Sequence, residues 1–361
     1  MYNTASVNNQ KWRDMKKLLQ SVTVLSLFVA AVFVGSHTNA QSTGLGVNPR
    51  KDLTVYPGKS VSDQLYISNL NKNVATKVNL NVVDFKSNGE TGTPALQLQE
   101  NAPQTPWSLK PFITLPKTIE LGPGESKYIP FSIRIPEGQG AGSYYSAIKY
   151  DPQPGEGSDT VVISGAPSQL VFVTVPGKAT ELMNLKKFGG YDIKDNQENG
   201  SFKSLYIGSQ PQKLAYLLQN AGNVAESPSG SIQIKNIFGK QVKFIKNANP
   251  KENLALIDQT RRFEVCIESE TKEVKQDGRT TKVESCKNPG LLPGIYRAHM
   301  SLFYGINGSN TQEINATTTI WYLPLWFIGV ILVVLAALAF AIYKIRAKLV
   351  GTKTHKRKGK K

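Results

Sequence analysis

The sequence predicts an all-β protein with two tandem Ig-like β-sandwiches and one C-terminal transmembrane helix. Three observations predict it: short apolar runs separated by Gly and Pro turns, an internal repeat, and one long uncharged segment near the C-terminus. Runs such as VSDQLYISN and SKYIPFSIRIP are rich in Val, Ile, Tyr and Phe, and turns such as Gly122-Pro123-Gly124 follow or precede them. Many short strands at regular spacing with turn signals between them are typical of a β-sandwich.

The long uncharged segment covers residues 321–343, WYLPLWFIGVILVVLAALAFAIY. It contains 23 residues without a charge, and about 20 apolar residues are enough to cross a bilayer as a helix. The amphipathic rings of Trp321, Tyr322 and Trp326 at one end and of Tyr343 at the other suit the two membrane interfaces. We therefore predict a membrane span over 321–343 with these four residues as interface anchors. A buried core helix is the alternative, although such helices rarely lack polar residues for so long.

The segment after the span, residues 344–361, carries nine Lys or Arg residues and no acid. Positive charge beside a span marks its cytoplasmic end, so we expect a cytoplasmic C-terminus and a location of residues 41–320 outside the cell membrane. Of the formal net charge of +17, this tail supplies nine and residues 1–17 supply a net three. The remaining +5 is ordinary for a pair of domains, so nucleic acid is not an expected partner.

Residues 1–40 read as a signal peptide. The stretch MKKLLQSVTVLSLFVAAVFVGSHTNAQ has a basic start, an apolar centre and small residues before a cleavage point between Ala40 and Gln41. Met15, which opens this stretch, is an alternative start of the chain. An uncleaved N-terminal anchor is the alternative reading, and in both cases the following residues are exported.

An internal repeat sets the number of domains. LYISNLNKNVATKVNL matches YLLQNAGNVAESPSGSIQI: each has an apolar strand, then Asn69 or Asn220, then Asn-Val-Ala and another strand. Asn at such a position bonds its own main chain and makes a tight turn. The length also suits two cores rather than one. We predict one Ig-like sandwich over 41–178 and a second over 179–320.

Longer stretches resemble a known family. DLTVYPGKSVSDQLYISNLNKN and TIELGPGESKYIPFSIRIPEGQGAGSYYSAI, then QTRRFEV and PGIYRAHMSLFYG, resemble the two domains of WxL-interacting-type bacterial cell-surface proteins. The resemblance covers nearly the whole mature chain. It implies a first domain that binds peptidoglycan, a second that binds a partner surface protein, and a C-terminal membrane anchor. It implies no individual binding residue.

Residues for catalysis or for metal binding are scarce. His299 is the only histidine within 41–320, and it lies in the strand-like run RAHMSLFYG; GxSxG and HExxH are absent from the sequence. We therefore predict no enzyme, no catalytic residue, no metal site and no cofactor, although paired carboxylates of a glycosidase need no such motif. For Trp107 we favour a core position over a sugar-stacking platform.

Cys266 and Cys286 are the only cysteines. A pair in an exported domain is typical of a disulfide, whereas a metal site needs further ligands nearby. Between them lie two charged strand-like runs around Asp277-Gly278, which predicts a hairpin with the disulfide at its base. Two independent thiols are the alternative.

Taken with the membrane span, these features predict a single-pass bacterial surface adaptor or scaffold. Its Ig-like domains would bind cell-wall polymer, another surface protein, or both. A carbohydrate-binding module is the alternative, and an extracellular hydrolase is a further one. The sequence specifies neither the ligand, nor the binding face, nor the oligomeric state.

Overall fold

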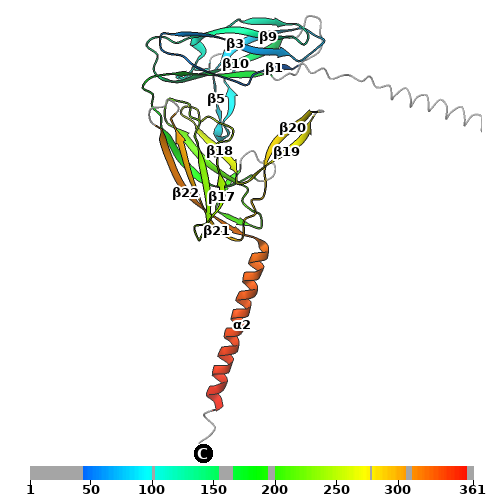
Figure 1. The fold of residues 1–361 in the computed structure, drawn as a ribbon, viewed down its shortest axis with the longest axis vertical. Helices are drawn as coiled ribbons and strands as arrows, with labels where there is room; N and C mark the ends of the chain where they lie inside the picture. The colour runs from blue at the N-terminus through cyan, green and yellow to red at the C-terminus, as the bar shows by residue number, and fades with distance from the viewer. Residues whose placement is uncertain are drawn as a thin grey trace, which may run out of the picture. The chain divides into compact units, whose positions relative to one another are not determined.

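The computed structural model describes residues 44–99, 102–153, 166–193, 200–276, 279–305 and 311–355. These residues confirm the predicted fold class: two tandem Ig-like β-sandwiches followed by one apolar helix (Figure 1). From Leu45 onward the chain belongs to one compact unit. The predicted signal peptide, with its cleavage point between Ala40 and Gln41, and the last part of the basic tail lie outside the described residues.

The first sandwich packs a four-stranded sheet, in the order β1-β3-β9-β7, against a five-stranded sheet, in the order β2-β11-β10-β4-β8, counting the described strands. These strands are β1 Leu45–Val47, β2 Arg50–Thr54, β3 Ser60–Asn69, β4 Thr76–Val83, β7 Ile113–Thr114, β8 Thr118–Leu121, β9 Ser126–Arg134, β10 Gly142–Gln153 and β11 Ser168–Val175. The 3-10 turn η2, Lys110–Phe112, precedes β7. A separate hairpin consists of β5 Phe85–Asn88, the 3-10 turn η1 Gly89–Thr91 and β6 Thr93–Leu96.

The second sandwich repeats this plan in its described strands, with the orders β13-β12-β15-β18 and β14-β22-β21-β16-β17. The strands are β12 Met183–Asp192, β13 Ser201–Lys203, β14 Leu205–Ile207, β15 Lys213–Asn220, β16 Ser229–Asn236, β17 Gln241–Ile245, β18 Thr260–Cys266, β21 Gly294–Tyr304 and β22 Gln312–Leu323. A two-stranded ribbon of β19, Ser269–Gln276, and β20, Arg279–Cys286, is inserted after β18. In each sandwich a short strand pairs in parallel with the last strand, β2 with β11 and β14 with β22.

The repeat seen in the sequence has a structural basis in two buried asparagines. Asn69 closes the turn between β3 and β4: its Nδ2 donates to the carbonyl oxygens of Val74 at 2.8 Å and Gly122 at 2.9 Å. Its Oδ1 accepts from the amide of Asn71 at 3.0 Å. The side chain thus joins its own turn to the turn that precedes β9.

Asn220 does the same at the end of β15. Its Nδ2 donates to the carbonyl oxygens of Val224 at 2.6 Å and Ala255 at 2.9 Å, and its Oδ1 accepts from the amide of Gly222 at 2.9 Å. Both asparagines are buried. Because buried main-chain groups must be paired, one amide side chain in each sandwich stabilises two connections at once.

The two sandwiches share a hydrophobic cluster, which we call the inter-sandwich cluster. It contains residues of β5, β10 and β11 from the first sandwich and of two loops from the second: Phe85, Tyr145, Ala147, Phe172, Ala225, Leu254, Leu256 and Ile257. The Phe85 and Phe172 rings meet edge to face with centroids 5.9 Å apart. Next to the cluster, the amide of Ser87 donates to Oε1 of Gln259 at 2.7 Å. The two cores are therefore connected through buried apolar contacts.

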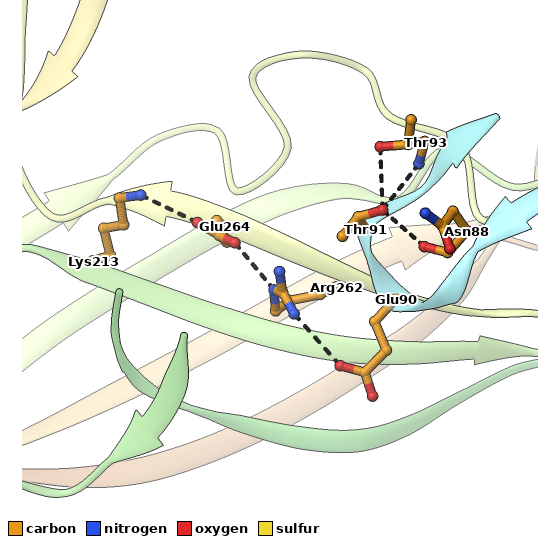
Figure 2. Close-up of polar contacts among 7 residues, drawn as sticks. All are labelled: Asn88, Glu90, Thr91, Thr93, Lys213, Arg262 and Glu264. Atoms are coloured by element: carbon orange, nitrogen blue, oxygen red, sulfur yellow. Dashed lines mark hydrogen bonds and ion pairs between the residues drawn. The ribbon is translucent and has the colours of Figure 1, made fainter. Parts of the chain in front are cut away.

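Ion pairs lie beside this cluster, where η1 reaches β18 (Figure 2). Arg262 lies between two carboxylates: Nη1 is 3.6 Å from Oε2 of Glu90 in the first sandwich, and Nε donates to Oε1 of Glu264 at 3.0 Å. The other oxygen of Glu264 is 3.2 Å from Nζ of Lys213. Since the Arg262 side chain is only 7 % exposed, these carboxylates compensate a charge that is largely removed from water.

The tip of the β5–β6 hairpin is held by Thr91, as Figure 2 shows. Its hydroxyl donates to the carbonyl of Asn88 at 2.8 Å and accepts from the amide of Thr93 at 3.3 Å. Gly92 follows with φ +75°, and a Cβ there would also collide with the side chain of Arg261. The positive φ favours glycine at this turn, and a larger residue would also require the Arg261 guanidinium to shift.

The structure corrects the start of the predicted span and the end of the second sandwich. Strand β22 continues to Leu323, and the helix α2, Leu325–His355, begins after Pro324. Tyr322 is only 6 % exposed and belongs to the core of the second sandwich, while Trp321 lies on the strand. Neither is an anchor in a helix, because residues Trp321–Leu323 are needed to pair with β14.

The remaining apolar segment is still long enough to cross a membrane. Leu325–Ala347 comprises 23 residues with a mean hydropathy of 2.9, and none of its most apolar window is buried against the protein. Trp326 and Tyr343, the other two predicted anchors, are exposed on this helix. Their placement at membrane interfaces stays a prediction.

Replacing the buried asparagines tests the repeat. Asn220→Ala leaves two buried carbonyl groups without this donor, so we expect it to lower the free energy of unfolding by about 2–4 kcal/mol. Asn69→Ala leaves two part-buried carbonyl groups without a donor, so we expect a loss of about 1–3 kcal/mol. Denaturant unfolding measures it. Asn73→Ala, at the exposed tip of the first turn, is the control and should change stability by less than about 0.5 kcal/mol. Equal, small effects at all three positions would contradict the structural role.

Truncation tests the corrected boundary. A chain ending at residue 320 lacks the buried Tyr322 and the partner of β14, whereas one ending at 323 keeps both. Loss of a buried aromatic side chain costs about 3–5 kcal/mol, so the shorter chain should melt at a markedly lower temperature. Thermal unfolding followed by circular dichroism compares the two. Coincident melting curves would show that the sandwich ends before residue 321.

Candidate functional site

The outer face of the sheet β1-β3-β9-β7 carries two tyrosines, the exposed Tyr128 and the half-buried Tyr66. Tyr66 on β3 and Tyr128 on β9 are direct cross-strand partners, and their ring centroids are 5.5 Å apart with an interplanar angle of 58°. The Tyr128 side chain is 66 % exposed. Opposite residues of an antiparallel pair project to the same face, so the rings form one aromatic surface above the sheet.

Hydroxyl and amide groups surround these rings. Oη of Tyr66 lies 3.2 Å from Oγ of Ser126, which in turn donates to Oγ of Ser68 at 3.0 Å. Hydrogen bonding with the hydroxyl groups of Ser126 and then Ser68 lowers the pKa of the Tyr66 phenol from its ordinary value. Gln64, Ser62 and Ser132 follow along the same two strands. We call this surface the tyrosine face, consisting of Ser62, Gln64, Tyr66, Ser68, Ser126, Tyr128, Pro130 and Ser132.

The tyrosine face is rigid and uncharged. Apolar residues that alternate with its members point the other way: Leu65, Ile67, Ile129, Phe131 and Ile133 are buried in the core of the first sandwich. The alternating Asp63 and Lys127 are partly exposed and form ion pairs with Lys51 and Glu125. Both strands therefore are held in register from below. None of its members carries a charge. Such a surface offers apolar ring faces and many hydrogen-bonding groups, and suits a neutral, hydroxyl-rich ligand better than an ion.

An open groove of about 980 Å³ lies on the other sheet of the first sandwich, beside β4 and β8. Some of its polar residues already bond to one another: Asn81 donates to Asp151 at 3.0 Å and Thr118 to Asn79 at 3.0 Å. Lys149 pairs with Asp151 at 2.7 Å. Other lining groups do not, since the buried Oε1 of Gln97 has no hydrogen-bond partner among the described residues. Because none of its described lining residues is aromatic, this groove is a weaker candidate for a glycan than the tyrosine face.

The predicted disulfide is confirmed. Cys266, at the end of β18, bonds to Cys286, at the end of β20, with their Cα atoms 5.2 Å apart. Between them β19 and β20 pair along their whole length, from Ser269 opposite Cys286 to Gln276 opposite Arg279. The turn predicted at Asp277-Gly278 lies outside the described residues.

A carboxylate with two cationic partners lies beside this disulfide. Glu268 forms ion pairs with Lys243 of β17 and with Lys287, the latter at 2.9 Å. Their ammonium groups lower the pKa of Glu268 to about 2. The contact is exposed, so its role is to orient the base of the ribbon rather than to add much stability.

Two residues singled out in the sequence have structural places. His299 lies exposed on β21 with Nδ1 2.9 Å from Oγ1 of Thr317. Trp107 packs against the inter-sandwich cluster, with its ring centroid 6.0 Å from that of Tyr145, in line with the core position favoured for it. No group of three His, Cys, Asp or Glu residues that could hold a metal ion occurs among the described residues.

The tyrosine face was not predicted, although the sequence contains a signal for it. In QLYISN, Tyr66 lies between the apolar Leu65 and Ile67, and in SKYIPFSIR, Tyr128 precedes the alternating Ile129 and Phe131. Alternation places the two tyrosines on the solvent side. That they are neighbours depends on the pairing of β3 with β9, which the sequence does not state.

No family model and no curated protein matches the chain. Among solved structures, the class 5 fimbriae chaperone CfaA is similar at 11 % identity and a TM-score of 0.35, over 76 % of this chain and 99 % of that one. The E. coli chaperone DraB gives 12 % and 0.32 over 76 % and 98 %, and Pseudomonas aeruginosa CupB2 gives 9 % and 0.28 over 73 % and 96 %. Values this low carry no conclusion about function. The resemblance to WxL-interacting-type proteins stays a prediction.

Removing the disulfide tests its role. Closing a loop of about 20 residues restricts the unfolded chain by roughly 3 kcal/mol, so reduction should lower the melting temperature of the second sandwich. Amide hydrogen exchange should become faster near β18 to β20 and should stay unchanged in β3 and β9. The double variant Cys266→Ser/Cys286→Ser is the control, because added reductant should not change it further. Two free thiols in the exported protein would contradict the bond.

Proposed function

We propose that this chain is a membrane-anchored bacterial cell-surface adaptor whose first sandwich binds cell-wall glycan through the tyrosine face. The observation that supports it best is the Tyr66–Tyr128 pair on the uncharged, serine-rich tyrosine face. In this proposal the chain binds and does not catalyse, and it needs no cofactor.

The chemistry of the surface favours a glycan. Sugar rings have apolar faces that pack on aromatic rings, and hydroxyl and amide edges that bond to serine and glutamine side chains. Serine is depleted at protein–protein interfaces, whereas tyrosine is enriched there. The mixture of the two residues on one flat surface therefore supports a wall polymer over a protein at this face.

The arrangement of the described chain supports an adaptor. The first sandwich is connected to the second by the inter-sandwich cluster and by the contacts of Arg262. The second passes into the apolar helix α2 after a single residue, Pro324. With that helix in the membrane, a ligand held by the first sandwich would be coupled to the cell surface.

For the second sandwich, the proposed partner is another surface protein, as the family resemblance implies. The ribbon β19–β20 supports this, because it extends from the sandwich in Figure 1 and is fixed at its base by the disulfide. A preformed, restrained ribbon loses little conformational entropy on binding.

Alanine substitution of the two tyrosines tests the proposal. We expect Tyr66→Ala/Tyr128→Ala to weaken binding to purified peptidoglycan by about tenfold or more, as for central aromatic contacts elsewhere. Equilibrium pull-down with increasing peptidoglycan measures it. Because both side chains project from the sheet, the melting temperature should change little.

Tyr56→Ala is the matched control, since this exposed tyrosine lies in the loop between β2 and β3 and outside the tyrosine face. Its binding should equal that of the natural chain. Undiminished peptidoglycan binding by the double variant would refute the assignment of the face. A different outcome would assign the face to a protein: the natural chain does not bind peptidoglycan but co-purifies with a surface protein, and the double variant loses that protein.

A further inference from the structure

The end of the second sandwich from which α2 departs carries exposed apolar side chains on its loops. Phe238, in the β16–β17 turn, is 86 % exposed, and Leu292, in the loop before β21, is 75 % exposed. Ile207 at the end of β14 and Ile237 beside Phe238 are also exposed. We call these four residues the apolar rim. Large apolar side chains gathered at exposed loop tips mark a contact surface.

Strand register places the apolar rim around the start of α2. Ile207 pairs with Leu323, and the amide of Gly208 donates to the carbonyl of Leu323 at 3.1 Å. A Cβ on Gly208 would lie 3.6 Å from Leu325, the first residue of the helix. The end of β14 therefore touches the point where the helix begins.

The other two loops lie at the same end. Gly294, which follows the Leu292 loop, pairs with Tyr322 of β22. Asn236, which precedes Ile237 and Phe238, pairs with Tyr296 on the far side of β21. The side chains of both loops line one hollow of about 430 Å³, so they are neighbours.

Hydrogen bonds fix two of these loops together. Oε1 of Gln210 accepts from the amide of Leu291 at 3.0 Å. This joins the loop after β14 to the loop that carries Leu292. The loop that carries Leu292 is therefore held in a fixed position relative to the end of β14.

The charged residues of the three segments that form this end of the sandwich are all cationic. The segments 204–212, 235–243 and 287–297 contain Lys235, Lys240, Lys243, Lys287 and Arg297 and no Asp or Glu. Lys243 and Lys287 form ion pairs with Glu268, so Lys235, Lys240 and Arg297 are the cations that remain for a ligand. The loops at the opposite end of the sandwich include acids, among them Glu252 and Asp258. Apolar tips with flanking cations are the composition of protein surfaces that enter the interface of an anionic membrane.

We infer that the apolar rim inserts into the membrane–water interface on the outward side of the cell membrane, beside α2, so that the second sandwich rests on the bilayer. The membrane is the expected binding partner because the rim adjoins the start of the helix. If α2 enters the membrane at Leu325, the rim lies at the level of the lipid headgroups. Phe238 and Leu292 enter the boundary between headgroups and acyl chains, and Lys235 and Lys240 extend toward lipid phosphates. This inference rests on the membrane anchoring in the proposed function but not on glycan binding.

Fluorescent labelling of the full chain in vesicles tests the inference. Both native cysteines are held in the disulfide, so a new cysteine is a unique labelling site. Phe238→Cys and Leu292→Cys are labelled with an environment-sensitive dye, and the proteins are reconstituted in phosphatidylglycerol vesicles with or without lipids that carry a doxyl quencher near the top of the acyl chain. Inserted labels should lose fluorescence by about twofold or more, because an inserted surface reaches about 5–10 Å into this region.

Two matched variants make each outcome decisive. Leu182→Cys places the label at an exposed leucine at the opposite end of the sandwich, where quenching should be absent. Val333→Cys places it in the middle of α2, where quenching reports the span. Quenching at 333 without quenching at 238 and 292 would overturn the inference and leave the anchored adaptor intact. Absence of quenching at 333 would overturn both.

Discussion

Strand β22 is the constraint on which the arrangement of the second sandwich and the helix depends. It pairs with β21 along Gln312–Tyr322 and with β14 along Trp321–Leu323, and it contributes Ile320 and Tyr322 to the core. Pro324 then ends the strand and begins the helix: its carbonyl accepts from the amides of Phe327 at 3.0 Å and Ile328 at 3.2 Å. Proline lacks the donor that a further ladder bond requires, and its fixed φ suits a first helical turn. The helix therefore leaves a packed strand directly, without a flexible linker.

The joint between the sandwiches uses a different kind of contact. Its apolar part, the inter-sandwich cluster, is not directional, whereas the pairs of Arg262 with Glu90 and Glu264 are. Arg262 also lies over the ring of Tyr191 at 5.0 Å. Loss of either carboxylate would leave a largely buried charge less compensated, which is costly, so the ion pairs select one position of the hairpin on β18 rather than add much net stability. A directional contact of this kind is what an adaptor needs if binding at one domain is to be transmitted to the other.

Local features of this fold could be predicted from the sequence, and non-local ones could not. Alternating strands, turn residues, the cysteine pair and the repeated Asn69 and Asn220 are each visible within one stretch of chain. The boundary at Pro324 was misplaced because Trp321 and Tyr322 suit a membrane interface and a strand equally well by composition. Their assignment to the strand depends on pairing with β14, more than 100 residues earlier in the chain. The contact of Glu90 with Arg262 is equally non-local.

The same distinction explains why the two proposed surfaces differ in how they can be recognised. The tyrosine face follows from period-two alternation once β3 and β9 are known to pair, because each strand reveals by itself which residues point outward. The apolar rim has no periodicity, since Phe238 and Leu292 lie in two loops and Ile207 at the end of β14, in segments of unlike sequence. What unites them is the antiparallel register of β16 with β21 and of β21 with β22, and the parallel register of β14 with β22, which bring three loop ends to one edge. One exposed Phe in a turn means little by itself, because single exposed apolar side chains are common. Several of them at the edge from which an apolar helix leaves form the pattern that the inferred membrane contact explains.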